Sequence, residues 1–366
     1  MKVLHIGEYV SGGTNTYINE LIKIQSNSEA INHIVILLSH FKSDTIYSNN
    51  NKIEIQYYKY QRKITYIIKN IFLFNHWINK IKPDIIHVHG TFAGLMIRIG
   101  YFFRRKKHPI VYCSHGWSFL MDTGYLKKRV YILIEKILSI RTDYMINISE
   151  YEDLMAKEKG LNATKMITIS NGIAEEENKL GASIEINPFD TKKKNLLFVG
   201  RFDKQKGLDL LIDFFSTYED NSVHLYIIGE NVLDKYEVKV PKNVTLIGKV
   251  VHESIDYYYE KIDAVIIPSR WEGFGLVAIE AMKNAKPIIV SNRGALPDFV
   301  NKQYGYVFDL DNLNSLRAIL ENLSKDELFD MGLIGKSIFK EKYTIKKMAK
   351  DIETLYFQML KKEESK

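Results

Sequence analysis

The stretch Asp263-Ala-Val-Ile-Ile-Pro-Ser-Arg-Trp-Glu-Gly-Phe-Gly-Leu-Val-Ala-Ile-Glu-Ala-Met-Lys283 decides the fold of this 366-residue chain. Its short apolar run, 264–267, predicts a buried parallel strand. Pro268 ends that strand, because proline cannot donate a hydrogen bond to a sheet ladder. Residues 276–283 show helical periodicity without a breaker, so the stretch predicts a strand, a glycine-bearing loop and a helix.

The loop in this stretch has the composition of an anion-binding site. Two glycines allow the backbone to approach a ligand, and the first N–H groups of the helix point towards it. Such a site suits a phosphate or pyrophosphate. Glu272 precedes the helix and Glu280 lies inside it, so each is aimed at a different part of one ligand; two surface glutamates at a strand–helix corner are the alternative. The backbone residues expected at the ligand are Gly273, Phe274, Gly275 and Leu276.

A second loop between a strand and a helix carries two cations. Residues 195–199 predict a strand, and Gly200-Arg-Phe-Asp-Lys-Gln-Lys-Gly207 follows it. Arg201 and Lys206 flank this loop, where two cations can neutralise a diphosphate. When such residues stand alone, solvated surface is the usual interpretation.

Predicted strands alternate with predicted helices along the chain, which indicates parallel, doubly wound sheets with ligands at the carboxyl ends of their strands. The length exceeds one ordinary core and predicts two domains. We expect domains at 1–172 and 195–344, joined by a linker at 173–194 that has no sustained period. In the first domain the expected strands are 3–7, 33–39, 53–57, 84–89, 110–113, 143–148 and 166–169.

Glu272-Gly-Phe-Gly-Leu276, with a second glutamate eight residues after the first, resembles the signature of retaining GT-B glycosyltransferases of glycosyltransferase family 4. The flanking Pro268-Ser269 and Pro287-Ile-Ile-Val-Ser291 also match. The resemblance covers nearly the whole chain, most strongly 195–300. It implies an α/β fold of GT-B architecture, in which two Rossmann-like doubly wound domains face each other across a cleft. It also implies that the C-terminal helix, within 345–366, crosses back to the first domain.

The resemblance also implies roles for single residues. Arg201 and Lys206 fit the family's Gly-Arg-x-x-x-x-Lys-Gly motif and would stabilise the leaving diphosphate. Glu280 would bind ribose hydroxyls, and Glu272 hydroxyls of the donor sugar. His115 resembles the acceptor-domain histidine near the transferred sugar, and a merely structural histidine is the alternative. The expected catalytic residues are His115, Arg201, Lys206 and Glu272.

Four further positions are implied as donor-binding: Gly12, Gly13, Gly229 and Val250. A plain tight turn would also explain the Gly12-Gly13 pair, which does not form a Gly-x-Gly-x-x-Gly fingerprint. The implied reaction moves a sugar from a uridine diphosphate donor, such as an N-acetylhexosamine, to a hydroxyl of a lipid-linked saccharide with retention of configuration. Such a reaction serves the synthesis of a bacterial capsule, exopolysaccharide or O-antigen. Lys286 and Arg293-Gly294-Ala295 depart from the family pattern beside the sugar-contacting region, which leaves donor identity open.

Two other enzymes are compatible with the same fold. A mannosyltransferase that uses guanosine diphosphate mannose is the alternative donor choice. A sugar-nucleotide epimerase is the alternative reaction; it would need additional acid–base residues and no acceptor. A tandem-Rossmann dehydrogenase lacks support, because no Gly-x-Gly-x-x-Gly follows a strand.

The charge is concentrated in the first half. Residues 52–141 hold 17 basic and 4 acidic residues of a chain whose net charge is +7. Basic residues interleaved with aromatics, as in Tyr101-Phe-Phe-Arg-Arg-Lys-Lys107, fit an anionic membrane surface. A solvated basic face or a nucleic-acid patch are the alternatives, and no nucleic-acid module is visible. No apolar run is long enough to span a bilayer and no signal peptide is evident. We expect a cytoplasmic protein, peripheral on the inner face of the membrane.

The sequence predicts no metal and no cofactor besides the nucleotide sugar. Cys113 is the single cysteine, which excludes an intrachain disulfide or a cysteine cluster. His87 and His89 share one face of a strand and mimic a ligand pair, but carboxylates in a ligand pattern are lacking. Asp309-Leu-Asp311 matches a metal-binding Asp-x-Asp, yet it precedes a predicted helix, where aspartate commonly serves as N-cap.

Overall fold

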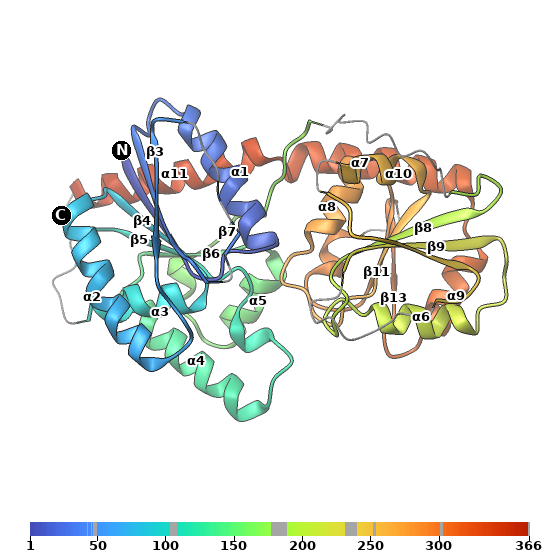
Figure 1. Ribbon diagram of the computed structural model, residues 1–366, viewed down its shortest axis with the longest axis horizontal. Coiled ribbons are helices and arrows are strands. Elements are labelled where there is room, and N and C mark those ends of the chain that lie inside the picture. The colour runs from blue at the N-terminus through green and yellow to red at the C-terminus, as the bar shows by residue number, and fades with distance from the viewer. Residues whose placement is uncertain are drawn as a thin grey trace. The chain divides into compact units, whose positions relative to one another are not determined.

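A computed structural model describes residues 1–41, 43–44, 46, 50–102, 108–176, 189–230, 240–251, 254–300 and 303–364. Three predicted features therefore lie wholly or partly outside the described residues: most of the linker (177–188), the basic run 103–107 and the start of a helix at residue 252. The chain forms two compact units, Met1–Ile173 with Ile345–Lys366, and Ala174–Thr344 (Figure 1). Within the described ranges, none of the helices is long and apolar enough to cross a membrane.

The first unit is built on a seven-stranded sheet in the order β3-β2-β1-β4-β5-β6-β7, with all neighbours parallel. The inner strands β1, β2, β4, β5 and β6 are buried on both faces, as parallel strands covered by helices require, whereas the edge strands β3 and β7 are mostly half-buried. The strand order reverses between β1 and β4, so a ligand site is expected at the carboxyl ends of these strands. The strands are β1 (Lys2–Gly7), β2 (His33–Ser39), β3 (Ile53–Tyr58), β4 (Ile85–His89), β5 (Ile110–Cys113), β6 (Tyr144–Asn147) and β7 (Met166–Thr168).

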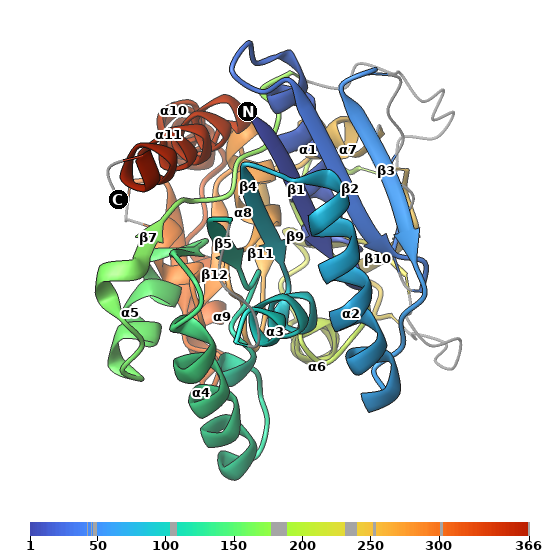
Figure 2. The same cartoon turned by 90° about the vertical axis from the view of Figure 1, so that its left-hand side faces the viewer.

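Helices cover this sheet on both faces. α2 packs against α3, and these helices close a core that includes Phe74 and Met96 (Figure 2). α1 packs against the C-terminal helix. The helices of the unit are α1 (Gly13–Asn27), α2 (Ile64–Ile81), α3 (Thr91–Gly100), α4 (Tyr125–Ser139), α5 (Glu150–Glu158) and α11 (Ile345–Glu364), with short 3-10 turns η1 (Ser118–Leu120) and η2 (Ala163–Lys165).

The second unit has a six-stranded parallel sheet in the order β10-β9-β8-β11-β12-β13. Its order reverses between β8 and β11, the two strands whose following loops carry the predicted cations and glutamate. The strands are β8 (Lys194–Val199), β9 (Val223–Ile228), β10 (Val244–Gly248), β11 (Ala264–Ile267), β12 (Ile288–Ser291) and β13 (Gly305–Phe308). The helices are α6 (Leu208–Ser216), α7 (Ile255–Lys261), α8 (Leu276–Lys283), α9 (Asn314–Glu321) and α10 (Lys325–Lys342), with the turn η4 (Leu296–Phe299).

The C-terminal helix returns to the first unit. The backbone N–H of Ile345, at its start, donates to the carbonyl of Ile173 at 2.9 Å. Ser28, after α1, donates to Glu353 of α11 at 2.7 Å. The predicted GT-B architecture, with two doubly wound units and a returning C-terminal helix, is confirmed.

One helix was not predicted. α4 buries Glu135, Leu138 and Ser139 and exposes most of its large apolar residues. Its sequence therefore lacks the apolar face that predicts a helix packed on a core. A buried ion pair fixes it to the sheet side instead: Arg98 of α3 donates to Glu135 at 2.8 Å and lies over the ring of Tyr112.

The N-cap interpretation of Asp309-Leu-Asp311 is wrong. α9 begins at Asn314, and its N-cap residue, Leu313, offers no side-chain acceptor. Asp309 instead accepts hydrogen bonds from the N–H of Asp311 and the amide of Asn292, which tie a longer loop together. Asp311 forms an ion pair with Arg293. The helix begins at Asn314 and not near Asn312, where the sequence predicts it, because these contacts satisfy the polar groups of the loop.

Candidate active site

Lys206 and Glu272 meet in the second unit. Lys206 comes from the loop after β8 and Glu272 from the loop after β11, and Nζ lies 2.9 Å from Oε2. The two side chains are 19% and 12% exposed, so the pair is partly withdrawn from water but still reachable. The sequence placed these residues in separate motifs, and the adjacency of β8 and β11 brings them together.

Backbone and side-chain contacts bind the same two loops along their length. Gln205 donates from its amide to the carbonyl of Trp271 at 3.2 Å, and the N–H of Arg270 donates to the carbonyl of Gln205 at 2.8 Å. The Arg270 guanidinium makes two bonds, of 2.6 and 2.7 Å, to the carboxylate of Asp209. This arginine holds the pKa of Asp209 below its ordinary value. Sequence reasoning missed the Arg270–Asp209 pair, because nothing local relates the two residues.

The backbone of Glu272 is clamped by a third loop. Gly294 has a φ of 59°, and a Cβ built there would lie 2.2 Å from the carbonyl oxygen of Glu272. The next residue, Ala295, donates its N–H to that same oxygen at 3.0 Å. Only glycine permits so close an approach in the left-handed region. The glycine pattern that departs from the family therefore positions a predicted site residue.

The helix start after Glu272 is built as predicted. Gly275 is the N-cap residue of α8, with a φ of 110° and no side-chain cap. Gly273 precedes the buried ring of Phe274, which packs edge-on against Phe299. Leu276 is the first helical residue. A helix start lacks i−4 carbonyl partners for its first amides and suits phosphate. Here the N–H of Ala278 donates to the carbonyl of Gly275 at 2.9 Å.

Glu280 lies inside α8 and is held by a tyrosine. The hydroxyl of Tyr259, on α7, donates to Oε2 of Glu280 at 3.0 Å. Burial, together with the neighbouring carboxylate, raises the pKa of Tyr259 well above its ordinary value, so the hydroxyl keeps its proton. Tyr259 is fully buried while Glu280 is half-buried. The sequence contained no signal for this tyrosine beyond a run of aromatic residues.

The other predicted residues of this unit lie around the same sheet edge. Arg201 is 58% exposed and bonds within its own loop, to Asp203 at 3.0 Å. Gly229 follows β9, and its N–H donates to the carbonyl of Gly248 at 2.9 Å. Val250 is half-buried, two residues after β10. The structure thus joins Lys206 to Glu272 but ties Arg201 to Asp203 instead.

The first unit holds the remaining predicted residues. Gly12, with a φ of 55°, is the N-cap of α1, and Gly13 is its first helical residue. Both glycines are exposed, and a Cβ on Gly12 would meet no atom within 4 Å. The N–H of Gly12 donates to Asp44 at 3.2 Å. The exposed backbone of Gly12 agrees with a ligand-facing loop, although the space around it does not require glycine for close packing.

His115 follows β5 in a strained turn. Its φ is 53°, unusual for a residue with a side chain. Nε2 lies 2.9 Å from Nδ1 of His89, and Nδ1 lies 3.6 Å from Sγ of Cys113. The ring of Tyr17 packs edge-on at 4.6 Å. Burial lowers the pKa of His115 to about 3, so the imidazole is neutral, although the residue as a whole is only partly buried from solvent.

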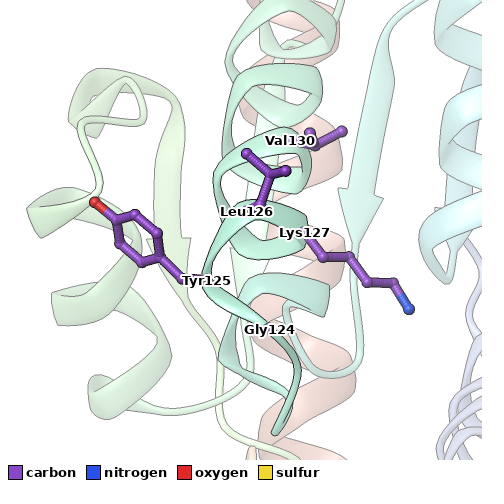
Figure 3. Close-up of a pocket in the computed structure, with 5 residues that line it drawn as sticks. All are labelled: Gly124, Tyr125, Leu126, Lys127 and Val130. Carbon is purple, nitrogen blue, oxygen red and sulfur yellow. The ribbon is translucent and has the colours of Figure 1, made fainter.

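A hollow of about 580 Å³ lies elsewhere, at the N-terminal end of α4 (Figure 3). It is lined by Gly124, Tyr125, Leu126, Lys127 and Val130. The hollow is wide open to solvent and has no carboxylate or histidine among these residues. It is therefore a feature of the exposed face of α4 and not of the loops that carry Lys206 and Glu272.

Comparison with protein families matches both halves of the chain. Residues 182–337 match the model described as "Glycosyl transferases group 1". Residues 11–177 match the model described as "Glycosyltransferase Family 4". Together the two matches leave out little besides the C-terminal helices and the extreme N-terminus.

Curated relatives agree with these matches. An uncharacterized 41.2 kDa protein in the cps region of Klebsiella pneumoniae is 33% identical over 88% of this chain and 90% of its own length. The capsular polysaccharide biosynthesis glycosyltransferase CapM of Staphylococcus aureus is 29% identical, covering 82% of each chain. An Escherichia coli enzyme named UDP-Gal:alpha-D-GlcNAc-diphosphoundecaprenol alpha-1,3-galactosyltransferase is 25% identical over 77% of each chain.

Solved structures share the fold. Sucrose-phosphate synthase from Thermosynechococcus elongatus has a TM-score of 0.79 at 18% identity, covering 98% of this chain and 99% of that one. The HepE protein of Anabaena in complex with UDP has a TM-score of 0.77 at 17% identity, covering 97% and 99%. At these identities the likeness establishes the two-unit architecture alone.

Proposed function

Since this chain belongs to the glycosyltransferase family matched by both of its halves, group 1 and family 4, we propose that it transfers a sugar from a uridine diphosphate donor to a hydroxyl of a lipid-linked saccharide. The Lys206–Glu272 contact beside the first turn of α8 carries the proposal. This contact brings together a cation and a helix N-terminus, which can bind a diphosphate, and a carboxylate, which can bind sugar hydroxyls.

Each group has a distinct task in the proposed reaction. Lys206 and the amides of residues 273–276 bind the diphosphate and stabilise the charge that develops on it as the sugar departs. Arg201, exposed and bound to Asp203, supplies a second cation when it turns to the phosphates. Glu272 repels phosphate, so it accepts hydrogen bonds from hydroxyls of the donor sugar, and it also orients Lys206. Glu280, oriented by Tyr259, accepts from the ribose hydroxyls.

The transfer step is proposed to retain configuration. The bond between the anomeric carbon and the β-phosphate oxygen breaks, and the acceptor oxygen bonds to the same face of that carbon. The acceptor proton passes to the departing phosphate oxygen, so no enzymic nucleophile is required. We expect turnover without a divalent ion, because the cations and the helix N-terminus take the charge-neutralising role that a metal has in other transferases.

The proposed substrates follow from the relatives' names. The HepE structure contains UDP, and a further HepE structure contains UDP-glucose. The Escherichia coli enzyme is named for a UDP-galactose donor and an acceptor linked to diphosphoundecaprenol. Other relatives are named for capsule and O-antigen biosynthesis. A uridine diphosphate sugar and a lipid-linked acceptor of a surface polysaccharide are therefore the substrates proposed here.

An acceptor with a lipid tail requires the enzyme to work at a membrane surface, and the first unit offers a suitable face. On α4, Leu126, Val130 and Leu133 are 76%, 48% and 59% exposed. Ile64 and Phe72 on α2 are 73% and 70% exposed. The segment 52–141, which includes both helices, holds 17 basic and 4 acidic residues. Apolar residues with flanking cations suit an anionic leaflet, so we propose that the protein is peripheral on the inner face of the cell membrane.

Donor use is tested with the whole protein and a panel of nucleotide sugars, in buffer that contains EDTA. Hydrolysis or transfer from one uridine diphosphate sugar, lost in Lys206→Ala and retained in Lys204→Ala, is the expected result. Lys204 is an exposed lysine of the same loop and so controls for the change in charge. Preference for guanosine diphosphate mannose would overturn the donor assignment, and activity that requires a divalent ion would overturn the metal-free site. Interconversion of a nucleotide sugar without an acceptor would identify an epimerase instead.

A further inference from the structure

Three buried histidines lie on the face of the first sheet that α1 and α11 cover. β1 and β4 pair so that His5 is opposite His87, and His89 follows two residues later on the same face. All three side chains are fully buried. The rings of His5 and His89 are stacked, with centroids 5.2 Å apart. Burying a polar ring without a hydrogen-bond partner costs free energy, so the partners of these histidines indicate their role.

The ring nitrogens of His5, His89 and His115 form one continuous chain of hydrogen bonds, which starts at Gln25. Gln25 Oε1 lies 2.9 Å from His5 Nε2. His5 Nδ1 lies 2.9 Å from His89 Nε2, and His89 Nδ1 lies 2.9 Å from His115 Nε2. The last contact joins His115 Nδ1 to the sulfur of Cys113 at 3.6 Å. The chain thus runs from the interior, under α1, to a partly exposed residue at the carboxyl end of β5.

When all of these imidazoles are neutral, only one set of tautomers satisfies every hydrogen bond along the row. Burial lowers the pKa of His5 to about 4 and that of His89 well below its ordinary value, so each ring carries one proton. The amide oxygen of Gln25 only accepts, and therefore the His5 proton is on Nε2. His5 Nδ1 must then accept from His89 Nε2–H, and His89 Nδ1 from His115 Nε2–H. Each ring fixes the tautomer of the next.

We propose that Gln25, His5 and His89 are positioning residues that hold His115 in its Nε2–H tautomer and present Nδ1 as an acceptor to a substrate hydroxyl. A thiol is a weak donor, so the contact with Cys113 is readily exchanged for a hydroxyl. The chain also holds His115 in its left-handed turn, where a side chain would not otherwise settle. This inference rests on the proposed function, because it needs a substrate at the end of β5.

A metal ion is the competing interpretation of the same cluster. His5, His87 and His89 each offer a nitrogen, and these atoms lie within 4.8 Å of one another. Two nitrogens bound to a tetrahedral zinc are about 3.3 Å apart. The facing nitrogens of His5 and His89 are 2.9 Å apart, the distance of a hydrogen bond. The hydrogen-bonded chain therefore describes this geometry better than metal coordination does.

Nitrogen-15 spectra of the histidine-labelled full-length protein test the chain directly. We expect neutral Nε2–H forms for His5, His89 and His115 in the wild type, with signals assigned by single His→Phe variants. Gln25→Leu should shift the signals along the chain, whereas Gln25→Glu, which keeps an acceptor oxygen, should preserve the pattern. His87→Phe is the nearest control: His87 is equally buried and touches both rings, but its Nδ1 bonds to the hydroxyl of Tyr356 and not to another histidine, and that hydroxyl also accepts from the amide of Gln25 at 3.5 Å. A His115 ring with its proton on Nδ1 would overturn the proposal.

Kinetics separate positioning from mere support of the fold. Gln25→Leu and His89→Phe should lower kcat by about tenfold or more with little change in KM, as loss of an orienting partner does at other sites. Gln25→Glu should recover most of kcat, and His87→Phe should leave it near the wild-type value. Equal losses in His87→Phe and His89→Phe, or stoichiometric zinc in freshly purified protein, would overturn the assignment. If no donor is turned over, the proposed function fails, and the spectra still decide whether the chain exists.

Discussion

The ammonium of Lys206 and the carboxylate of Glu272 lie 2.9 Å apart although 66 residues separate them in sequence. Without a partner, the flexible side chain of a lysine at this position would extend into water in many conformations. Glu272 holds it in place, and the ammonium retains two further N–H donors for phosphate oxygens. In the proposed reaction, this contact holds Lys206 ready for the diphosphate before the donor binds.

Replacing Lys206 with Ala should reduce kcat/KM for the donor by about 100- to 1000-fold, the range seen when one group that stabilises developing charge is removed. The partly exposed ion pair contributes about 1 kcal/mol or less to stability, so the melting temperature should change little. Steady-state kinetics and thermal unfolding measure the two effects. Near-normal turnover in this variant, compared with Lys204→Ala, would remove Lys206 from the site.

Replacing Tyr259 with Phe should weaken donor binding while chemistry is largely preserved. Its hydroxyl donates to Glu280, which is proposed to bind the ribose, remote from the bond that breaks. Loss of a hydrogen bond to a charged group costs about 1.5–3 kcal/mol, which raises KM about tenfold or more. Tyr257→Phe, on the same helix, is the control. A fall in kcat at unchanged KM would contradict the ribose assignment.

Replacing Gly294 with Ala should disturb the site through the backbone. The new methyl group would overlap the carbonyl oxygen of Glu272, and the left-handed φ adds strain, so we expect a loss of about 1–3 kcal/mol of stability together with reduced activity. Gly124→Ala is the matched control, since a Cβ there meets no atom within 4 Å. Urea denaturation of both variants measures the difference. Equal stability of the two would show that the loop adapts freely.

The stability of the first unit should fall as the pH rises from about 7 to about 8; at lower pH the buried histidines, which are protonated only in the unfolded chain, give the opposite slope. Burial raises the pKa of Glu152 from its ordinary value of 4.5 to about 8, so in this window the folded protein keeps a proton that the unfolded chain releases. More protons bound to the folded state give a negative slope of unfolding free energy against pH. Glu152→Gln should flatten that slope, whereas Glu150→Gln, at the exposed start of α5, should not. Urea midpoints at several pH values measure it.

The exposed face of α4 should bind anionic vesicles. Leu126→Glu combined with Val130→Glu should reduce sedimentation with vesicles of acidic phospholipid by tenfold or more, because charge is placed where an apolar surface meets the lipid. The residues are exposed, so folding and donor hydrolysis in solution should be retained. Leu154→Glu changes an exposed leucine on α5 and serves as the control. Equal vesicle binding by the double variant and by Leu154→Glu would show that the exposed face of α4 does not contact the membrane.

Local pattern was sufficient for most of the fold. The strand 264–267 and the helix 276–283 were predicted with the bounds that the structure has. Ser149 caps α5, since its hydroxyl accepts from the N–H of Glu152 at 3.1 Å. These features depend on periodicity, glycine, proline and short-range hydrogen bonds, all of which act between residues close in sequence.

The structure alone decided which distant side chains meet. His5 and His89 are 84 residues apart and become partners because β1 and β4 are neighbours in register. α4 was missed because a buried ion pair holds it and most of its apolar residues are exposed. Its sequence therefore does not show a buried apolar face. The sequence by itself determined most of the elements and the two loops that carry Lys206 and Glu272. Tertiary structure determined their hydrogen-bond partners, because strand order and helix packing, which periodicity does not encode, set those distances.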